Sequence, residues 1–436
     1  MRRSIVLTGA VIATAALAAP VAVADTTTTG APDLGRQVLG ERDGWAAAEG
    51  GTTGGAAAED DAVFHVGNRA ELVAALDGGS PTPKIIYVDG AIEGHEADDG
   101  TPLSCADFAD PDYSLDDYLA AYDPEHWGYE EEPHGPLEDA RDRSMRNQRD
   151  HIQVRVGSNT TLVGLGADAE IRGLNLSVRD ADNVIIRNIT FEAPVDCFPA
   201  WDPTDNEAGE WNSEYDAVEL HGATHVWVDH NTFHDGRYPD SSQPWYFGRP
   251  YQWHDGLLDM VRETDLVTVS WNVFQDHDKT MLIGNSNSRF EDRGKLRITL
   301  HHNVFSETLE RSPRVRFGQV HVYNNYYESI DGLGYHVGVG VESKVVTDNN
   351  YFRLGERFTA GDVVYDWGGT AIRTRGDVVE DQDGRRRVDL RAEHNLAHGS
   401  ELSADVGWVP RWHERIHPAS AVPGLVPARA GAGRVG

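Results

Sequence analysis

Four basic side chains fall in two short stretches of the second half of the chain. Arg311, Arg314 and Arg316 lie close together in "RSPRVRFG", and Lys279 lies in "QDHDKTMLIG". Side chains alternate along an extended strand, so Arg314 and Arg316 share one face while the apolar residues around them face the core. Taken alone, outward arginines are usually solvated surface charge. If folding gathered all four cations in one place, their mutual repulsion would favour an anionic ligand there.

Three aspartates offer the opposite chemistry a little earlier in the chain. Asp216 lies in "EYDAVELHG", and Asp255 and Asp259 lie four residues apart in "WHDGLLDM". Carboxylates from loops and strand ends form an oxygen-rich, incomplete cage that suits Ca²⁺, with water or a ligand completing the shell. The spacing is not that of an EF-hand. In a chain with 71 acidic residues, ordinary surface charge is the competing interpretation.

Histidines near these stretches raise the question of zinc, namely His254, His277, His301 and His302. No HExxH or similar ligand spacing is present. We therefore expect these histidines to bond to neighbouring backbone groups. No nucleophile elbow and no phosphate-binding loop stand out either.

A recurring phrase indicates how these residues are positioned. It reads "VIIRNITF", "VWVDHNTF", "VTVSWNVF", "ITLHHNVF", "VHVYNNYY" and "VVTDNNYF". Its asparagines are Asn231, Asn272, Asn303, Asn325 and Asn350, and its final aromatics are Phe191, Phe233, Phe274, Phe305, Tyr327 and Phe352. Asparagine tolerates left-handed backbone and can bond to the asparagine of the next turn, and the aromatics can stack in register.

This repeat predicts a parallel β-helix, with a β-sandwich as the alternative. The shortest gaps match one solenoid turn, and the longer gaps imply loops inserted on a common turn. Lys279 and Arg311 follow the phrase at nearly equal distances, so stacking would bring the cations to one patch of wall. The three aspartates lie one and two turns earlier.

The two ends of the chain differ in composition from its centre. Residues 1–24 resemble a secretory signal, with Arg2 and Arg3 before an apolar run and a small-x-small cleavage site. Residues 25–60, rich in Thr, Gly and Ala, predict a flexible lead-in with a short fixed stretch near Trp45, and residues 425–436 a frayed tail. The main domain is then 61–424, and we expect a secreted, extracellular monomer.

The charge balance narrows the possible partners. A formal net charge of −33 argues against nucleic acid and against anionic membranes. The acidic segment "DFADPDYSLDDYLAAYDPEHWGYEEEP" predicts a solvated helical excursion. Cys105 and Cys197 are free to pair outside the cell, but the sequence leaves a disulfide open.

Four motifs in order carry a family resemblance: "THVWVDHNTFHDGR", "WHDGLLDM", "DHDKTMLIG" and "RSPRVRFGQVHVYNNYY". They closely resemble the secreted, bacillus-type pectate lyases of polysaccharide lyase family 1. The similarity runs from about residue 63 to about residue 352 and becomes loose beyond residue 353. The resemblance implies an all-β, single-domain right-handed parallel β-helix with inserted loops and an N-terminal helical excursion.

The resemblance also implies an activity and the residues that carry it. The activity is calcium-dependent cleavage of α-1,4-polygalacturonate by β-elimination, giving 4,5-unsaturated products. The family's calcium ligands fall on Asp216, Asp255 and Asp259, its catalytic base falls on Arg311, and its substrate-carboxylate contacts fall on Lys279 and Arg316. The role of Arg314 stays open.

An arginine base is unusual because guanidinium is normally protonated. Ca²⁺, Lys279 and Arg316 all disfavour a further charge on Arg311, so we expect them to lower its pKa and to give an alkaline activity optimum. Two alternatives remain, a pectin lyase acting on methyl-esterified chains without calcium and a non-catalytic β-helix that binds polysaccharide. A hydrolytic polygalacturonase would need clustered carboxylates and no basic pair.

Overall fold

The computed structural model describes residues 33–435. The expected signal peptide at 1–24 and the first residues of the lead-in lie outside the described residues. From Leu34 onward the chain forms one compact unit. None of the described helices combines the length and apolar composition that a membrane crossing needs.

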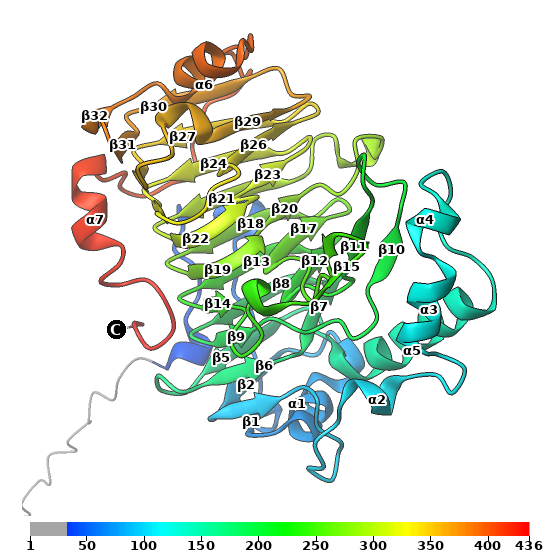
Figure 1. Ribbon diagram of the computed structural model, residues 1–436. Helices are drawn as coiled ribbons and strands as arrows, with labels where there is room; N and C mark the ends of the chain where they lie inside the picture. Colours follow the sequence, from blue (N-terminus) through cyan, green and yellow to red (C-terminus); the bar gives the residue numbers. More distant parts are fainter. Residues whose placement is uncertain (1–32, 436) are drawn as a thin grey trace, which may run out of the picture. The chain divides into compact units, whose positions relative to one another are not determined.

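Three parallel sheets wind around a common axis as a right-handed parallel β-helix (Figure 1). Sheet 1 contains β1 Val63–Val66, β2 Lys84–Val88, β5 Thr160–Gly164, β8 Asp182–Arg187, β13 Thr224–Asp229, β18 Asp265–Ser270, β21 Arg297–His301, β24 Gln319–Tyr323, β27 Lys344–Asp348 and β30 Ile372–Arg375. Sheet 2 contains β4 Gln153–Arg155, β7 Asn175–Arg179, β12 Val218–His221, β17 Leu258–Val261, β20 Leu282–Ile283, β23 Arg314–Val315, β26 Val337–Gly340 and β29 Val364–Trp367. Sheet 3 contains β3 Ala91–Glu93, β6 Glu170–Arg172, β9 Thr190–Glu192, β14 Thr232–His234, β19 Val273–Lys279, β22 Val304–Glu310, β25 Tyr326–Ser329, β28 Tyr351–Leu354, β31 Val378–Asp381 and β32 Gly384–Arg387.

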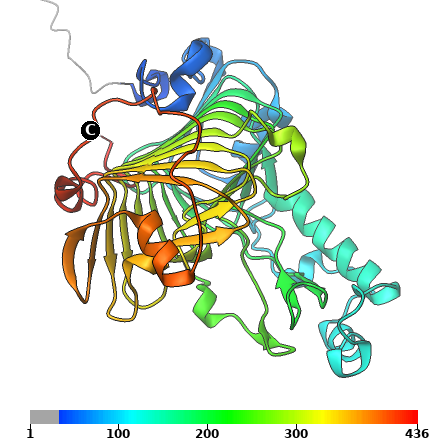
Figure 2. The ribbon, with the colours of Figure 1, turned by 90° about the horizontal axis from the view of Figure 1, so that it is seen from above.

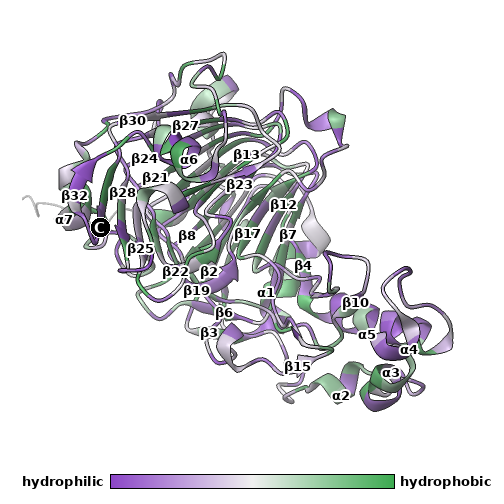
Figure 3. Ribbon diagram, turned by 45° about the horizontal axis from the view of Figure 1, so that its top comes forward, coloured by the Kyte–Doolittle hydropathy of each residue, from purple (hydrophilic) through white to green (hydrophobic). Residues whose placement is uncertain are grey.

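From β4 to β31 each turn of the coil contributes one strand to each sheet, so the strands stack along the axis (Figure 2). All the pairings within these three sheets are parallel except β31 with β32. Apolar residues run along the strands (Figure 3) and fill a continuous buried core. Two antiparallel hairpins project from loops before sheet 2, namely β10 Ala200–Asp202 with β11 Glu210–Asn212 and β15 Trp245–Tyr246 with β16 Arg249–Pro250.

The recurring asparagines form the predicted ladder. Each donates its backbone N–H and its side-chain Nδ2 to the Oδ1 of the next, at 2.8 to 3.1 Å, from Asn231 to Asn350. Asp377 ends the ladder by accepting from Asn350 at 2.9 Å. The left-handed backbone lies one residue before each asparagine, at φ of 51 to 56°, and not at the ladder asparagine itself.

The aromatics of the repeat also stack as expected. Adjacent ring centroids are 4.4 to 5.1 Å apart along the whole series from Phe191 to Phe352. Two internal columns, one of amides and one of rings, therefore hold successive turns in register. A shift of one residue in any turn would break both columns at once.

The acidic segment forms the N-terminal helical excursion (Figure 1). Its helices are α2 Cys105–Phe108, α3 Leu115–Ala121, α4 Pro124–Trp127 and α5 Pro136–Ile152. Rings from α3 pack with Trp201 and Trp211 of the first hairpin. Tyr215 donates through its hydroxyl to the carbonyl of Met145 on α5 at 2.8 Å. The excursion therefore supports the loop that ends at Asp216.

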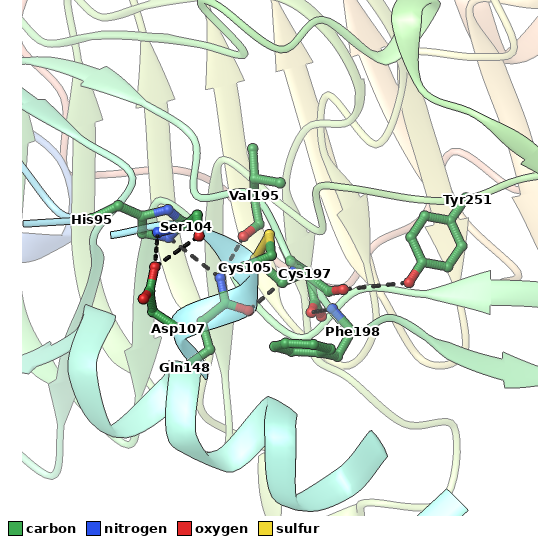
Figure 4. Close-up of a disulfide and its surroundings, with 10 residues drawn as sticks. His95, Ser104, Cys105, Asp107, Gln148, Val195, Cys197, Phe198 and Tyr251 are labelled. Carbon is green, nitrogen blue, oxygen red and sulfur yellow. Dashed lines mark hydrogen bonds between the residues drawn. A yellow bond between two sulfur atoms is a disulfide. The ribbon is translucent and has the colours of Figure 1, made fainter. Parts of the chain in front are cut away.

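A disulfide joins Cys105 on α2 to Cys197 in that same loop (Figure 4), which settles the question left open by the sequence. The two Cα atoms are 5.4 Å apart. Next to it, Gln148 of α5 donates to the carbonyl of Val195 at 2.7 Å and accepts from the N–H of Cys197 at 3.0 Å. The bridge and the amide fix the same loop from two sides.

The described part of the lead-in is fixed over more than the short stretch expected near Trp45, so the expectation of flexibility in the rest of it is wrong. Leu39 and Ala46 pack against Ile185 and Trp227 of sheet 1. A Cβ on Gly44 would lie 2.2 Å from Thr268 Oγ1, so only glycine allows this close approach. The small residues that suggest flexibility in the sequence instead allow the lead-in to pack closely against sheet 1. The other helices of the unit are α1 Arg69–Leu76, α6 Leu390–His398 and α7 Val422–Leu425.

The tail is likewise fixed where the sequence predicts fraying. Val426 and Ala430 pack with Tyr326 and Tyr351 on sheet 3. Three successive backbone N–H groups, from Gly431 to Gly433, donate to Trp271 O, Thr232 Oγ1 and Asn188 Oδ1. Composition alone does not show this, because the partners belong to three different turns.

Candidate active site

The three predicted aspartates meet at the amino-terminal ends of two adjacent strands of sheet 2. Asp216 precedes β12, Asp255 precedes β17, and Asp259 lies on β17, which pairs with β12. One carboxylate oxygen from each lies within 4.8 Å of the others. We call this group the acid triad.

Local backbone holds the triad in place. The N–H of Gly256 donates to Asp216 Oδ1 at 2.7 Å, and the N–H of Leu282 donates to Asp259 Oδ1 at 2.8 Å. A Cβ on Gly256 would lie 2.5 Å from Asp259 Oδ1 and 2.8 Å from Asp216 Oδ1. Glycine at this position therefore leaves the room in which the carboxylates converge.

The charges of the triad are not neutralised by one another. Asp216 and Asp259 are only 7% and 6% exposed. Burial, together with Asp259 and Asp255, raises the pKa of Asp216 well above its usual range. Burial and Asp255 raise the pKa of Asp259 to about 7. Three converging hard oxygen donors whose repulsion is unrelieved fit a divalent cation such as Ca²⁺.

The predicted cations lie on the next turns of the coil. Lys279 ends β19, and its register partner is Glu310, the residue before Arg311. The nearly equivalent positions expected for Lys279 and Arg311 are therefore confirmed. Lys279 Nζ donates to Gln252 Oε1, so a loop before Asp255 orients the lysine.

Arg311 and Arg316 are each held by one or two contacts. Arg311 has φ of 60° and donates from Nε to Glu310 Oε1 at 2.9 Å. Arg316 donates from Nε to Asn287 Oδ1 and from Nη1 to the carbonyl of Gly284, both at 2.7 Å. Each guanidinium keeps further N–H groups for a ligand.

Electrostatics link the cations to the triad. The charge of Arg311 acts to lower the pKa of Asp259. Burial lowers the pKa of Arg311, but Glu310, Asp255 and Asp259 outweigh it, so the net shift of its pKa is upward. Without a metal ion, carboxylates are the charges that dominate at Arg311, so the downward shift expected with Ca²⁺ bound stays a prediction. Burial, Arg314 and Arg311 lower the pKa of Arg316 to about 10.

The expectation that the histidines bond to backbone holds for His254 and for one nitrogen of His277, but it is wrong for His301 and His302, which contact each other and the side chains of Asp43 and His417. His254 bonds from its two ring nitrogens to the carbonyls of Pro194 and Tyr238 at 2.8 and 2.7 Å. His277 Nε2 lies 2.8 Å from the carbonyl of Asp255, and its Nδ1 lies 2.6 Å from Asp235 Oδ1. These contacts fix the loop that carries Asp255.

Sequence reasoning missed the residues that support the site. Glu310, Gln252 and Asn287 each orient a predicted cation, and His277 orients the loop of a predicted ligand. Glu310 alone carried a signal, since it is adjacent to Arg311 in the sequence. Gln252 and Asn287 come from loops outside the repeated phrase.

Comparison with known proteins agrees with this arrangement. The family model described as pectate lyase matches residues 14–105 and 136–387, which is well over half of the chain. The interval between the two matched parts contains α3, α4 and most of the acidic excursion. The match also extends past residue 353, beyond the range in which the motifs suggested similarity.

Individual relatives cover nearly the whole chain. A pectate lyase of Bacillus subtilis is 44% identical over 411 residues, which are 93% of this chain and 95% of that protein. Pectate lyase D of Dickeya chrysanthemi is 37% identical over 317 residues, 71% of this chain and 69% of that protein.

Solved structures give the same result. The thermostable pectate lyase PL 47 is 47% identical and superposes with a TM-score of 0.91, covering 93% of this chain and all of that one. A pectate lyase bound to a hexasaccharide is 44% identical, with a TM-score of 0.88 and the same coverage. The chain therefore belongs to the pectate lyase family and is a lyase of that class.

Proposed function

We propose that the protein cleaves α-1,4-polygalacturonate by calcium-dependent β-elimination, leaving a 4,5-unsaturated uronide at the new end. One observation supports this most directly: the acid triad and Arg311 lie within electrostatic range of each other along sheet 2, where Arg311 precedes β23, two strands beyond Asp259 on β17. A similar pectate lyase has been solved with a bound hexasaccharide, which supports an oligomeric uronide as the substrate.

The basic residues would bind and orient the polyanion. Lys279 and Arg316 each present free N–H groups beside the triad, and a guanidinium can hold a carboxylate through two parallel hydrogen bonds. Holding the substrate and the catalytic groups in a fixed geometry lowers the activation barrier, because the loss of translational and rotational entropy occurs on binding and not in the reaction step. Asp216, Asp255 and Asp259 would hold Ca²⁺, which, when bound, neutralises the triad and withdraws charge from the substrate carboxylate.

Arg311 would take the proton from C5 of the uronate. The C5–H electrons form the C4=C5 double bond, the C4–O bond breaks, and the glycosidic oxygen leaves with that electron pair and acquires a proton. Glu310 holds Arg311 Nε, which leaves the Nη groups to face the sugar. Neutralising Asp255 and Asp259 removes two of the charges that raise the pKa of Arg311, so we expect an alkaline activity optimum.

Location and assembly follow from the same proposal. The substrate is an extracellular polymer, so we propose that residues 1–24 direct secretion and are removed. The domain 61–424 would carry catalysis as a monomer, since all the proposed site residues come from one chain.

The test is product formation from polygalacturonate with calcium and with a chelator. We expect absorbance from unsaturated products only with calcium, and little product from highly methyl-esterified pectin. Calcium-independent cleavage of esterified pectin would favour a pectin lyase, and binding without product would favour a non-catalytic β-helix. Arg311→Ala should lose turnover and keep polymer binding, whereas the control Arg353→Ala, which breaks an ion pair with Glu328 on sheet 3, should keep both.

A further inference from the structure

Arg314, whose role the sequence leaves open, belongs to a polar and aromatic cluster on sheet 2. Its Cζ lies 3.8 Å from the ring centroid of Trp367 on β29. The ring of Tyr335, just before β26, lies 6.0 Å from that of Trp367. Tyr365 on β29 completes the group, with its ring 4.8 Å from Trp367 and 5.6 Å from Tyr335. We call these four residues the arginine–aromatic cluster.

The cluster lies further along sheet 2 than the acid triad, at matching positions on successive strands. Arg314 has Leu282 as its register partner on β20, and the N–H of Leu282 donates to Asp259. On the other side, Arg314 pairs with Gly338 on β26, which pairs with Tyr365 on β29. Strands stack about 4.8 Å apart, so Arg314 lies about two strand spacings, or ~10 Å, from Asp259 along the axis. A polymer lying along this row would reach both.

The strand between Arg314 and Tyr365 leaves room for the cluster. On β26 valines alternate with glycines, and all four residues are buried. A Cβ on Gly338 would lie 2.9 Å from Tyr335 Cε2 and 3.1 Å from both Arg314 Cγ and Trp367 Cδ1. The missing side chain is therefore what allows the three groups to converge.

Three polar atoms of the cluster have no partner among the described residues. They are Arg314 Nε, Tyr335 Oη and Trp367 Nε1, all buried. Tyr335 is only 2% exposed. Arg311 is paired with Glu310 and Arg316 with Asn287, whereas among the described residues Arg314 forms no ion pair and the hydrogen-bonding side chain beside it is Tyr335. Buried polar groups are normally satisfied, so converging unsatisfied donors indicate a ligand with acceptor oxygens.

We propose that the arginine–aromatic cluster is a second carboxylate subsite, which binds a galacturonosyl unit beyond the one that is cleaved. Arg314 and the hydroxyl of Tyr335 donate to the carboxylate of that unit, and the exposed ring of Tyr365 packs against the sugar. Trp367 holds the guanidinium plane in position from the opposite side. This subsite rests on the proposed function, and it predicts that affinity depends on substrate length.

The test compares KM and kcat for a series of oligogalacturonates of increasing length, with calcium. Arg314→Gln should raise KM about tenfold for the long members and leave KM for the short ones unchanged, with kcat largely retained. Tyr335→Phe should raise KM for the long members about threefold without lowering the thermal midpoint, because the hydroxyl makes no hydrogen bond of ordinary length and angle with the described residues. Tyr326→Phe and Arg353→Gln, which alter contacts to Glu328 on sheet 3, are the matched controls.

Two results separate the subsite from the reaction. If Arg314→Gln and Tyr335→Phe change KM equally at every length, or lower only the thermal midpoint, the cluster is structural and the subsite is wrong. If the unaltered protein forms no unsaturated product, the proposed function fails. Calorimetric titration with long and short oligogalacturonates in the Arg311→Ala background then still decides the subsite, through the same length-dependent loss of affinity.

Discussion

Two groups of three ligating side chains lie next to each other in this protein and differ in how their charge is balanced. The acid triad contains Asp216, Asp255 and Asp259. The second group, which we call the histidine triad, contains Asp235, Asp240 and His277, and its ligating atoms also lie within 4.8 Å of one another. The two groups touch, because His277 Nε2 lies 2.8 Å from the carbonyl of Asp255.

The histidine triad carries its own cation. His277 has an acceptor at each ring nitrogen, so both nitrogens must donate and the ring is an imidazolium. Burial alone would lower the pKa of His277, but Asp235 and Asp240 outweigh it and raise the pKa to about 9. Burial raises the pKa of Asp235, but His277 outweighs it, so its net shift is downward. In the acid triad the pKa of Asp216 is raised instead. The two groups therefore have similar geometry but different charge balance. We expect the acid triad to bind an added cation, whereas the histidine triad already contains one, the imidazolium of His277.

The largest expected effect comes from removing a charge from the acid triad. Asp216→Asn should lower lyase activity at least about 10³-fold at fixed calcium, because metal-based charge stabilisation contributes several kcal/mol. Calcium affinity, measured by calorimetric titration, should fall in parallel. Asp276→Asn is the matched control, since Asp276 is exposed and its φ of 53° suits asparagine. Retained calcium affinity in Asp216→Asn would contradict the distinction between the two groups.

Removing the internal cation should act on stability first. His277→Gln leaves the buried Asp235 and the half-buried Asp240 without a counter-charge, and breaking a buried pair costs about 3–5 kcal/mol. The thermal midpoint without calcium should fall accordingly, while the exposed control His126→Gln should not change it. Adding Asp235→Asn to His277→Gln should recover part of the loss, because the two residues interact directly. Additive effects of the two changes would show that the pair is not coupled.

These contrasts also show what the sequence can predict. The stacked wall was predictable because one phrase recurs, and each recurrence places its asparagine and its ring at the same point of a turn. Lys279 and Arg311 were predictable as neighbours for the same reason, since each follows that phrase at a similar offset, and the aspartates were expected one and two turns earlier. Their roles came from the resemblance to a family and stay proposals.

What the sequence could not show depends on pairs from different turns. His277 meets Asp235 across 42 residues, without a repeated spacing to connect them. Tyr335, just before β26, and Trp367, on β29, reach Arg314 from outside the repeated phrase. The upward shift in the pKa of Arg311 needed the positions of Asp255 and Asp259. In the lead-in, composition suggested flexibility where glycine in fact allows close contact.

The pH dependence of stability should separate the two groups in one experiment. The pKa of Asp259 is about 7 in the folded state and about 3.9 unfolded, so its contribution is full below about pH 4 and is lost as pH rises through 7. The pKa of His277 is about 9 folded and about 6.5 unfolded, so its contribution is full below about pH 6.5 and is lost as pH rises through 9. The second loss amounts to about 3 kcal/mol.

Calcium should remove only the first of these two declines. A bound cation holds Asp259 in its ionised form and so removes its titration near pH 7, but it leaves the surroundings of His277 unchanged. Those surroundings are Asp235, Asp240, Asp278, His254 and the carbonyl of Asp255. The measurement is the thermal midpoint from pH 4 to pH 10 with calcium and with a chelator. If calcium abolished the alkaline decline as well, the imidazolium would not be an independent counter-charge.

The smallest expected effect concerns Asp240, the weaker partner of the imidazolium. Asp240 Oδ2 lies 4.0 Å from His277 Nδ1, whereas Asp235 Oδ1 lies at 2.6 Å. Burial raises the pKa of Asp240, so its ionised form is disfavoured in the folded protein. An asparagine in its place can still accept the hydrogen bond from the N–H of Asp278. Asp240→Asn should therefore change the free energy of unfolding by no more than about 1 kcal/mol and leave calcium affinity intact. A large loss of calcium affinity would mean that Asp240 helps to bind the cation, and the two groups would then form one site.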